Sequence, residues 1–298
     1  MTGDPSNLDI FISPPLVAYG YAPFSLLSYG AAAALWTAIS LGLLAAGGVL
    51  VVRLTPSVPR EQRALLLLLW AASHPLIQLI GSGQDTAVSL LLWAGGVLLA
   101  LQRRDAASGL VFSLGLFKPQ LFFLPPVLFV LFGRRRALGA WVCGAALQIA
   151  LTMWLGGGRG VVAWLGILRS PEYLDFLQND MAYKMTSLVP VLHSIVPDSL
   201  GPAARIVGGV LSAGLLAATF VRLRWGARSG GLDERAAWAM ACLATLIATP
   251  HCFYYDLTLL VVPVALLMDL QRGLSSRVAR NALIAAYVLC WTAPMRRT

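Results

Sequence analysis

The stretch Tyr29–Leu54 (YGAAAALWTAISLGLLAAGGVLVVRL) decides the fold class, because it contains a single charged side chain, Arg53. A helix of about 20 apolar residues spans the hydrocarbon core of a bilayer, which is about 30 Å thick. Similar apolar runs follow along the whole chain. We expect membrane segments at residues 29–54, 62–80, 86–101, 137–155, 202–221, 235–249, 253–270 and 279–293, and two half-length segments at 106–117 and 121–132.

The composition agrees with a membrane protein. Hydrophobic residues make up 58% of the 298 residues and charged residues 12%, and the mean hydropathy is +0.75. Soluble domains contain about 25% charged and 45–50% apolar residues, so this composition excludes a soluble enzyme, a nucleic-acid-binding domain and a disordered chain. We therefore predict one all-α domain over residues 1–298, a polytopic transmembrane helical bundle of about ten membrane segments.

The four cysteines lie scattered in apolar segments and form no CxxC pair. This pattern indicates small packing residues rather than a metal site or a disulfide framework. We expect no cofactor and assign no metal-binding residues.

The basic residues predict the orientation of the helices. Every second connection is rich in arginine, and these five connections hold 15 of the 22 basic residues. They are centred on Arg53/Arg60/Arg63, Arg103/Arg104, Arg134–Arg136, Arg222/Arg224/Arg228/Arg235 and Arg272/Arg277/Arg280. By the positive-inside rule these connections are cytoplasmic, and the other connections and both tails lie outside.

Ionisable residues at the ends of apolar runs gather on the predicted outer side: His74, Asp85, Lys118, His251 and Asp256. A charge at membrane depth costs ~2.5–3.5 kcal/mol unless it is paired or faces water. The five residues therefore predict a polar cavity that opens outward. The alternative is that each side chain merely snorkels from a helix end to the interface.

The long outer connection, residues 156–201, has a pattern of its own. Val161, Trp164, Leu165 and Leu168 recur at helical spacing but cannot span the membrane. They predict an amphipathic helix lying on the outer leaflet. The polar patch 178–184 follows, and we expect it either to cover the cavity, with Asn179 and Lys184 binding substrate, or to be a solvated loop.

The candidate residues suit one kind of chemistry. Walker A, G-x-G-x-x-G, HExxH and G-x-S-x-G motifs are absent. An Asp carboxylate can take a proton from an attacking hydroxyl, and Lys118 can offer positive charge to a phosphate. An outward cavity near acyl-chain depth suits a lipid-linked phosphate substrate, and the expected partners are lipid substrates and the bilayer, not nucleic acid.

Several short blocks, in order, resemble the bacterial membrane glycosyltransferases of family 87. The first, with the family pattern "YPPL … P … ALW", is Ser13-Pro14-Pro15-Leu16, Pro23 and Ala34-Leu35-Trp36. The others are His74-Pro75, Gly83-Gln84, Gly109 with Lys118-Pro119, and Thr249-Pro250-His251 with Tyr255-Asp256. Together they cover residues 13 to about 263.

The resemblance implies a GT-C enzyme of the bacterial plasma membrane with an outward-facing active site. It would transfer a hexose, mannose in the best-known members, from a polyprenyl-phosphate sugar to a lipid-linked or cell-envelope glycan. The transfer would be inverting, with an aspartate as base and polyprenyl phosphate as leaving group. The expected substrate-binding residues are Lys118, Gln120, Gln84, His74, His251, Asn179 and Lys184. Asp256 and Tyr254 are expected to support the site, Asp256 as a helix cap or salt-bridge partner.

One departure from the family pattern concerns the catalytic base. In the family the proposed catalytic Asp lies in a first outer loop upstream of the PP motif, a region that would precede Met1 here. We expect a form shortened at its N-terminus; alternatively Asp9 or Asp85 is catalytic, or the chain is a non-catalytic homologue. A transporter or lipid flippase is a further alternative, although such proteins commonly show internal repeats, which are not visible here.

Overall fold

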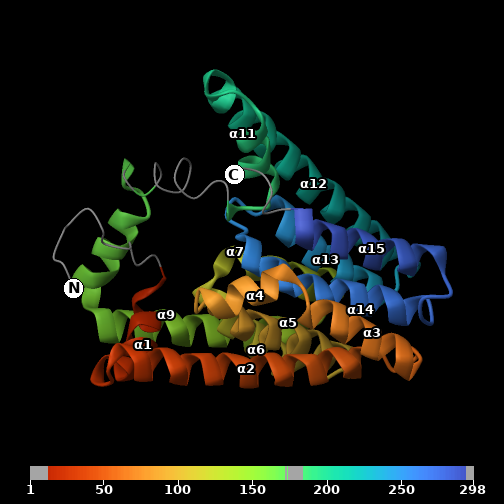
Figure 1. The fold of residues 1–298 in the computed structure, drawn as a ribbon, viewed down its shortest axis with the longest axis horizontal. Helices are drawn as coiled ribbons and strands as arrows, with labels where there is room; N and C mark the ends of the chain where they lie inside the picture. The colour runs from red at the N-terminus through yellow and green to blue at the C-terminus, as the bar shows by residue number, and fades with distance from the viewer. Residues whose placement is uncertain (1–12, 172, 174–183, 293–298) are drawn as a thin grey trace.

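The computed structural model describes residues 13–171, 173 and 184–292, and their regular structure is helical (Figure 1). The elements are α1 (Pro15–Tyr21), η2 (Ala22–Leu26), α2 (Tyr29–Leu54), α3 (Arg60–Ala71), α4 (His74–Gly81), α5 (Thr86–Leu101), α6 (Asp105–Ser113), η3 (Leu114–Phe117), α7 (Pro119–Phe122), α8 (Leu124–Leu131), α9 (Arg135–Ile167), α11 (Leu188–Ile195), η6 (Asp198–Leu200), α12 (Gly201–Ser229), α13 (Glu234–Ala248), η7 (Tyr254–Leu260), α14 (Val261–Leu270) and α15 (Arg277–Thr292). The all-helical prediction is therefore confirmed for this part of the chain.

The predicted number of ten membrane segments is not confirmed. Among the described residues, three helices are long and apolar enough to cross a bilayer: α2, α9 and α12. A fourth span results if α3 and α4 are counted together across their 49° bend. The other predicted segments are also helical, but their helices are shorter than these, because polar breaks and prolines divide the apolar runs.

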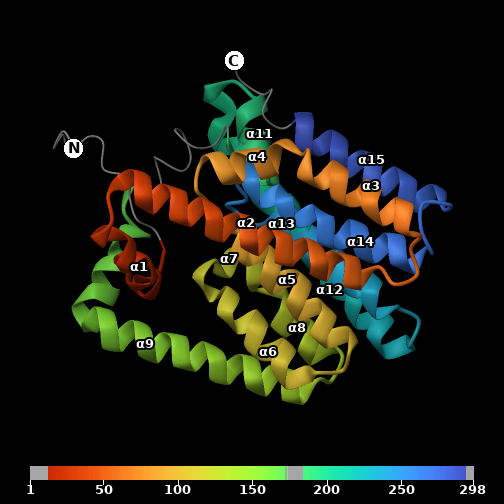
Figure 2. The ribbon, with the colours of Figure 1, turned by 60° about the horizontal axis from the view of Figure 1, so that its bottom comes forward.

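The core lies around α5, which packs against α2, α6 and η7 (Figure 2). Trp93 on α5, Phe112 on α6 and Trp238 on α13 are fully buried, and the rings of Phe112 and Trp238 stack 5.2 Å apart. Helices α6 and α9 approach so closely that a Cβ atom on Gly109 would lie 2.0 Å from the carbonyl oxygen of Ala137. Glycine at this position is therefore required by packing.

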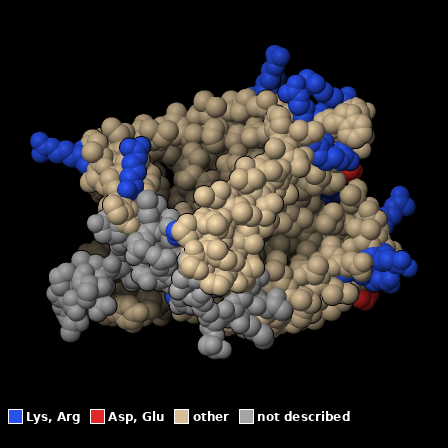
Figure 3. All heavy atoms as spheres, turned by 90° about the horizontal axis from the view of Figure 1, so that it is seen from above, with Lys and Arg blue, Asp and Glu red and all other residues tan. Residues whose placement is uncertain are grey.

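The five arginine-rich connections meet at one end of the bundle, where α2, α5, α8, α12 and α14 end (Figures 1 and 2). Arg134 is buried there and pairs with Asp105 at 3.1 Å and with Glu234 at 2.5 Å. Arg235 pairs with Asp269 at 3.2 Å. Figure 3 shows most of the visible Lys and Arg side chains at this end, on the right of the view. The five connections that the sequence predicted to share one side therefore form one layer linked by ion pairs, which we call the arginine layer.

Helix α9 contains the start of the predicted interfacial helix. It breaks at Gly157 (φ 63, ψ 167) and then continues to Ile167 in a new direction (Figure 1). Residues 158–167 are therefore helical, as the spacing of Val161, Trp164 and Leu165 predicted. The position of this arm on the outer leaflet stays a prediction, and most of the following polar patch lies outside the described residues.

Arg272 allows a test of the turn between α14 and α15. It is exposed and has φ 56, a left-handed conformation that disfavours side chains with a Cβ. The Arg272→Gly variant should therefore be more stable by roughly 1 kcal/mol in thermal unfolding in detergent. The control is Arg280→Gly, an exposed position inside α15, which should lose about 1 kcal/mol. A loss of stability in Arg272→Gly would contradict this account of the turn.

Candidate active site

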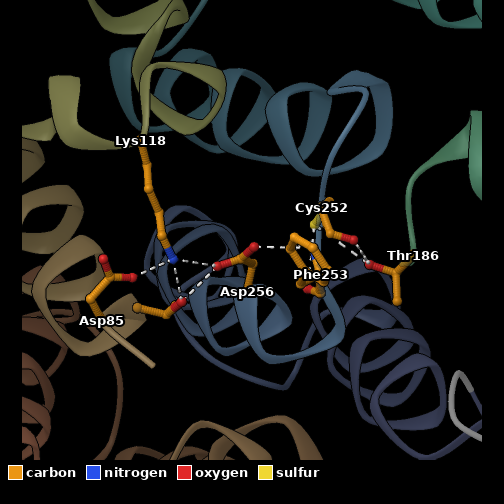
Figure 4. Close-up of polar contacts among 7 residues, drawn as sticks. Asp85, Lys118, Thr186, Cys252, Phe253 and Asp256 are labelled. Atoms are coloured by element: carbon orange, nitrogen blue, oxygen red, sulfur yellow. Dashed lines mark hydrogen bonds and ion pairs between the residues drawn. The ribbon is translucent and has the colours of Figure 1, made fainter. Parts of the chain in front are cut away.

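Three charged side chains meet at the end of the bundle opposite the arginine layer (Figure 4). Asp85 ends the turn before α5, Lys118 lies in the break between η3 and α7, and Asp256 lies in η7. These three segments are far apart in the sequence. Their meeting brings together the Asp85, Lys118 and Asp256 predicted from the distribution of polar residues.

The ammonium group of Lys118 occupies the centre of this cluster. Its Nζ lies 2.6 Å from Asp85 Oδ1, 3.3 Å from Asp256 Oδ1 and 3.1 Å from Thr86 Oγ1. The ring of Tyr255 lies below the same ammonium, with its centroid 5.3 Å away. An ammonium has three N–H donors, so these three oxygens use all of them.

The two carboxylates differ in how completely they are bound. Asp256 is almost fully buried; its Oδ1 also accepts a hydrogen bond from the hydroxyl of Thr86 at 2.6 Å, and its Oδ2 accepts one from the backbone N–H of Phe253 at 3.1 Å. Asp85 keeps 13% of its side chain exposed, and its one contact among those described above is with Lys118. Asp256 therefore caps the start of η7, and Asp85 is the more accessible carboxylate.

The backbone at Lys118 explains how its side chain reaches the cluster. Pro119 disfavours the helical conformation at the residue before it, and Lys118 has φ −128 and ψ 69. The two short helices on either side pack tightly, since a Cβ atom on Gly115 would lie 2.2 Å from the ring of Phe122. The break thus interrupts the helical run and turns one lysine toward two carboxylates.

The turn before Asp85 is held from the N-terminal part of the chain. Gly83 has φ +64, and its carbonyl oxygen accepts a hydrogen bond from Trp36 Nε1 at 2.7 Å. Tyr21 and Phe24 pack against the ring of Trp36 at centroid distances of 5.0 and 5.8 Å. The proline-rich and Ala-Leu-Trp blocks of the sequence therefore meet the Gly83-Gln84 block at this turn.

A second polar group lies on the same elements. His74 Nδ1 lies 2.6 Å from the hydroxyl of Tyr254, and its Nε2 lies 3.2 Å from Gln78 Nε2. The Tyr254 hydroxyl also donates to the carbonyl oxygen of Cys290. Because Tyr254 precedes Tyr255 and Asp256 in η7, the structure joins His74 to the predicted site through this tyrosine.

His251 lies in the connection between α13 and η7. Its Nδ1 is buried without a hydrogen bond to the part of the chain that the structure describes, and burial lowers the pKa of its imidazole. The connection is held to residues 185–186, since Thr186 N donates to Cys252 O at 2.8 Å and Met185 forms a β-bridge with Phe253. Lys184, which precedes this bridge, is exposed.

The remaining predicted residues are placed less centrally. Gln84 and Gln120 are half-buried, Gln84 next to Asp85 and Gln120 two residues after Lys118. Asp9 and Asn179 lie outside the described residues. No three His, Cys, Asp or Glu side chains come together as a metal site within residues 13–171, 173 and 184–292.

Two contributors to the cluster were not assigned from the sequence. Thr86 bridges Lys118 and Asp256, and Tyr255 lies over the ammonium. The position of Thr86 directly after Asp85, at the first residue of a helix, was the available signal. Tyr255 belongs to the Tyr255-Asp256 block, but its ring contact depends on how η7 approaches Lys118.

The model of glycosyltransferase family 87 matches residues 11–250, which is most of the chain. The chain belongs to glycosyltransferase family 87. No curated protein and no solved structure matches it significantly.

Membership of family 87 supports a membrane glycosyltransferase. The matched region includes His74, Asp85 and Lys118, and it ends at Pro250. His251 and Asp256 follow directly after it, and the structure places Asp256 against Lys118. The candidate active site of this family 87 chain is therefore formed mainly, but not wholly, by the matched region.

Removing the central cation should destabilise the fold. Lys118→Met leaves two largely buried carboxylates without their shared partner, and breaking a buried pair in this way costs about 3–5 kcal/mol. We expect a clearly lower melting temperature in detergent, partly restored in Lys118→Met/Asp256→Asn. The exposed Arg136 provides the control Arg136→Met, with an expected change below about 0.5 kcal/mol. Equal stability of Lys118→Met and wild type would contradict the pairing.

Proposed function

We propose that the Asp85–Lys118–Asp256 cluster is the active site for transfer of a hexose from a polyprenyl-phosphate sugar to a hydroxyl of a lipid-linked or cell-envelope glycan. The observation that carries this proposal is the unequal binding of the two carboxylates around one lysine. Family membership supports glycosyl transfer, and the apolar helices support a substrate that enters from the membrane.

Asp85 is the proposed general base. Its carboxylate is the more exposed of the two, whereas Asp256 is already bound by Lys118, Thr86 and the backbone of Phe253. A base must present a free lone pair to the hydroxyl that it deprotonates. Asp256 is the proposed positioning residue, since it holds the ammonium that in turn holds Asp85.

The proposed step balances as follows. Asp85 accepts the proton of the acceptor hydroxyl while that oxygen attacks the anomeric carbon. The bond between the anomeric carbon and the phosphate oxygen breaks, and polyprenyl phosphate leaves with the electron pair. A direct displacement of this kind inverts the anomeric configuration.

Lys118 couples proton uptake by Asp85 to the departure of the phosphate. In the resting cluster its three N–H groups point to three protein oxygens, which leaves none for a phosphate. When Asp85 takes up a proton it becomes neutral, and its attraction for the ammonium weakens. One N–H of Lys118 is then available for the charge that develops on the leaving phosphate, where a charge-assisted hydrogen bond is strongest.

Asp85→Asn tests the base. The amide keeps the shape but cannot accept the proton, so turnover should fall by roughly 10²–10⁴-fold, as expected for loss of a general base. Transfer of labelled hexose from a polyprenyl-phosphate sugar to membrane glycolipid is the measurement. Asp233→Asn is the control, because Asp233 caps α13 at the arginine end and Asn caps equally well. Wild-type turnover in Asp85→Asn would refute the base assignment.

The orientation of the site is a separate proposal: the cluster faces outward, because the arginine layer occupies the other end. We expect a cysteine at exposed Arg135 to resist an impermeant thiol reagent in intact cells and a cysteine at exposed Gly158 to react. Both are made in Cys143→Ser, since Cys143 is exposed and the other three cysteines are buried. The opposite labelling would place the site on the cytoplasmic face.

A further inference from the structure

The hydrogen-bonded chain from α15 through η7 to α4 determines which ring nitrogen of His74 carries a proton. The hydroxyl of Tyr254 contacts both the carbonyl oxygen of Cys290 and His74 Nδ1. A carbonyl oxygen can only accept, so the single hydroxyl proton of Tyr254 is committed to Cys290. The contact between Tyr254 and His74 at 2.6 Å then requires that His74 Nδ1 donate to the tyrosine oxygen.

The other nitrogen of His74 is consequently left as an acceptor in the neutral ring. Its present neighbour is the amide nitrogen of Gln78 at 3.2 Å, which donates to it. Gln78 is an exposed side chain one helical turn further along α4, and His74 itself is half-buried. Gln78 can therefore move away without breaking any core contact and leave a fixed lone pair behind.

The imidazole itself is held firmly. Its ring packs against Tyr254 at a centroid distance of 4.9 Å and against Trp291 at 6.0 Å. Helix α4 and η7 connect this imidazole to the charged cluster. Helix α4, which carries His74, is followed by the turn that ends in Asp85, and Tyr254 lies two residues before Asp256 in η7. A rigidly held hydrogen-bond acceptor beside a glycosyl-transfer site can bind a hydroxyl, the hydrogen-bond donor of which sugars carry several.

We propose that Tyr254 is a positioning residue that holds His74 in the Nδ1–H tautomer, and that His74 Nε2 accepts a hydrogen bond from a hydroxyl of the sugar acceptor in place of Gln78. The inference rests on the proposed function, to which it adds a second hydroxyl-binding position distinct from Asp85. It assigns no proton transfer to His74.

The first experiment needs no activity. The ¹⁵N shifts of the imidazole nitrogens distinguish the two tautomers and the imidazolium, and the chain has three histidines, which single His→Asn variants assign. In the neutral ring, measured at about pH 8, His74 should have a protonated Nδ1 and a bare Nε2. Tyr254→Phe should shift it toward a tautomer mixture, and the control Tyr287→Phe, on the same helix as Cys290, should not. A protonated Nε2 in the wild type, or an unchanged ratio in Tyr254→Phe, would overturn the inference.

The second experiment tests the ligand. His74→Asn retains an N–H for Tyr254 but lacks the distal acceptor, whereas His74→Gln places an oxygen near the Nε2 position. We expect His74→Asn to raise KM for the glycan acceptor by roughly five- to tenfold with kcat little changed, and His74→Gln to recover part of the loss. Unchanged KM in His74→Asn would refute hydroxyl binding. If wild-type membranes transfer no hexose at all, the proposed function fails while the tautomer result still stands.

Discussion

The rest of the site depends on one constraint, the need to pair every charge within a largely apolar bundle. Lys118 meets this need with two carboxylates from two other segments, at 2.6 and 3.3 Å. The cluster has two negative charges and one positive charge, so it is not neutral. Thr86 and the N–H of Phe253 supply the additional hydrogen bonds, and both go to Asp256. Asp85 has the shorter ion pair with Lys118, whereas the additional hydrogen bonds go to Asp256, so the proposed base is the carboxylate with fewer hydrogen bonds.

The same constraint arranges the opposite end. There the buried Arg134 pairs with Asp105 and Glu234, while Arg235 pairs with Asp269. Asp269 also accepts a hydrogen bond from the backbone N–H of Ser57. These pairs tie the arginine-rich connections to one another, so the pattern of positive charge from which we predict the orientation also holds one end of the bundle together.

Some of this architecture could be predicted from the sequence. Uninterrupted apolar runs such as Tyr29–Leu54 and Thr86–Leu101 correspond residue for residue to α2 and α5, because nothing in them competes with a helix. The helices within residues 62–80 and 106–132 were harder to predict, since Pro75 and Pro119 divide these runs into short helices whose angles depend on packing. The residues of the cluster could be proposed from their position at one end of the apolar runs. Their pairing could not, because it depends on how three distant segments approach one another.

The short sequence blocks that resemble family 87 now have a physical explanation. Trp36 binds the carbonyl of Gly83, whose positive φ shapes the turn that ends in Asp85. Pro119 keeps Lys118 out of the helical conformation, and the backbone N–H of Phe253 donates to Asp256. Each block is short because it supplies one contact, and the blocks are distant in the sequence because the site is assembled between helices. Residues such as Trp36, which touch no charged group of the cluster, therefore act on Asp85 through the backbone. Their contribution to the site is to fix the direction from which a carboxylate meets its lysine.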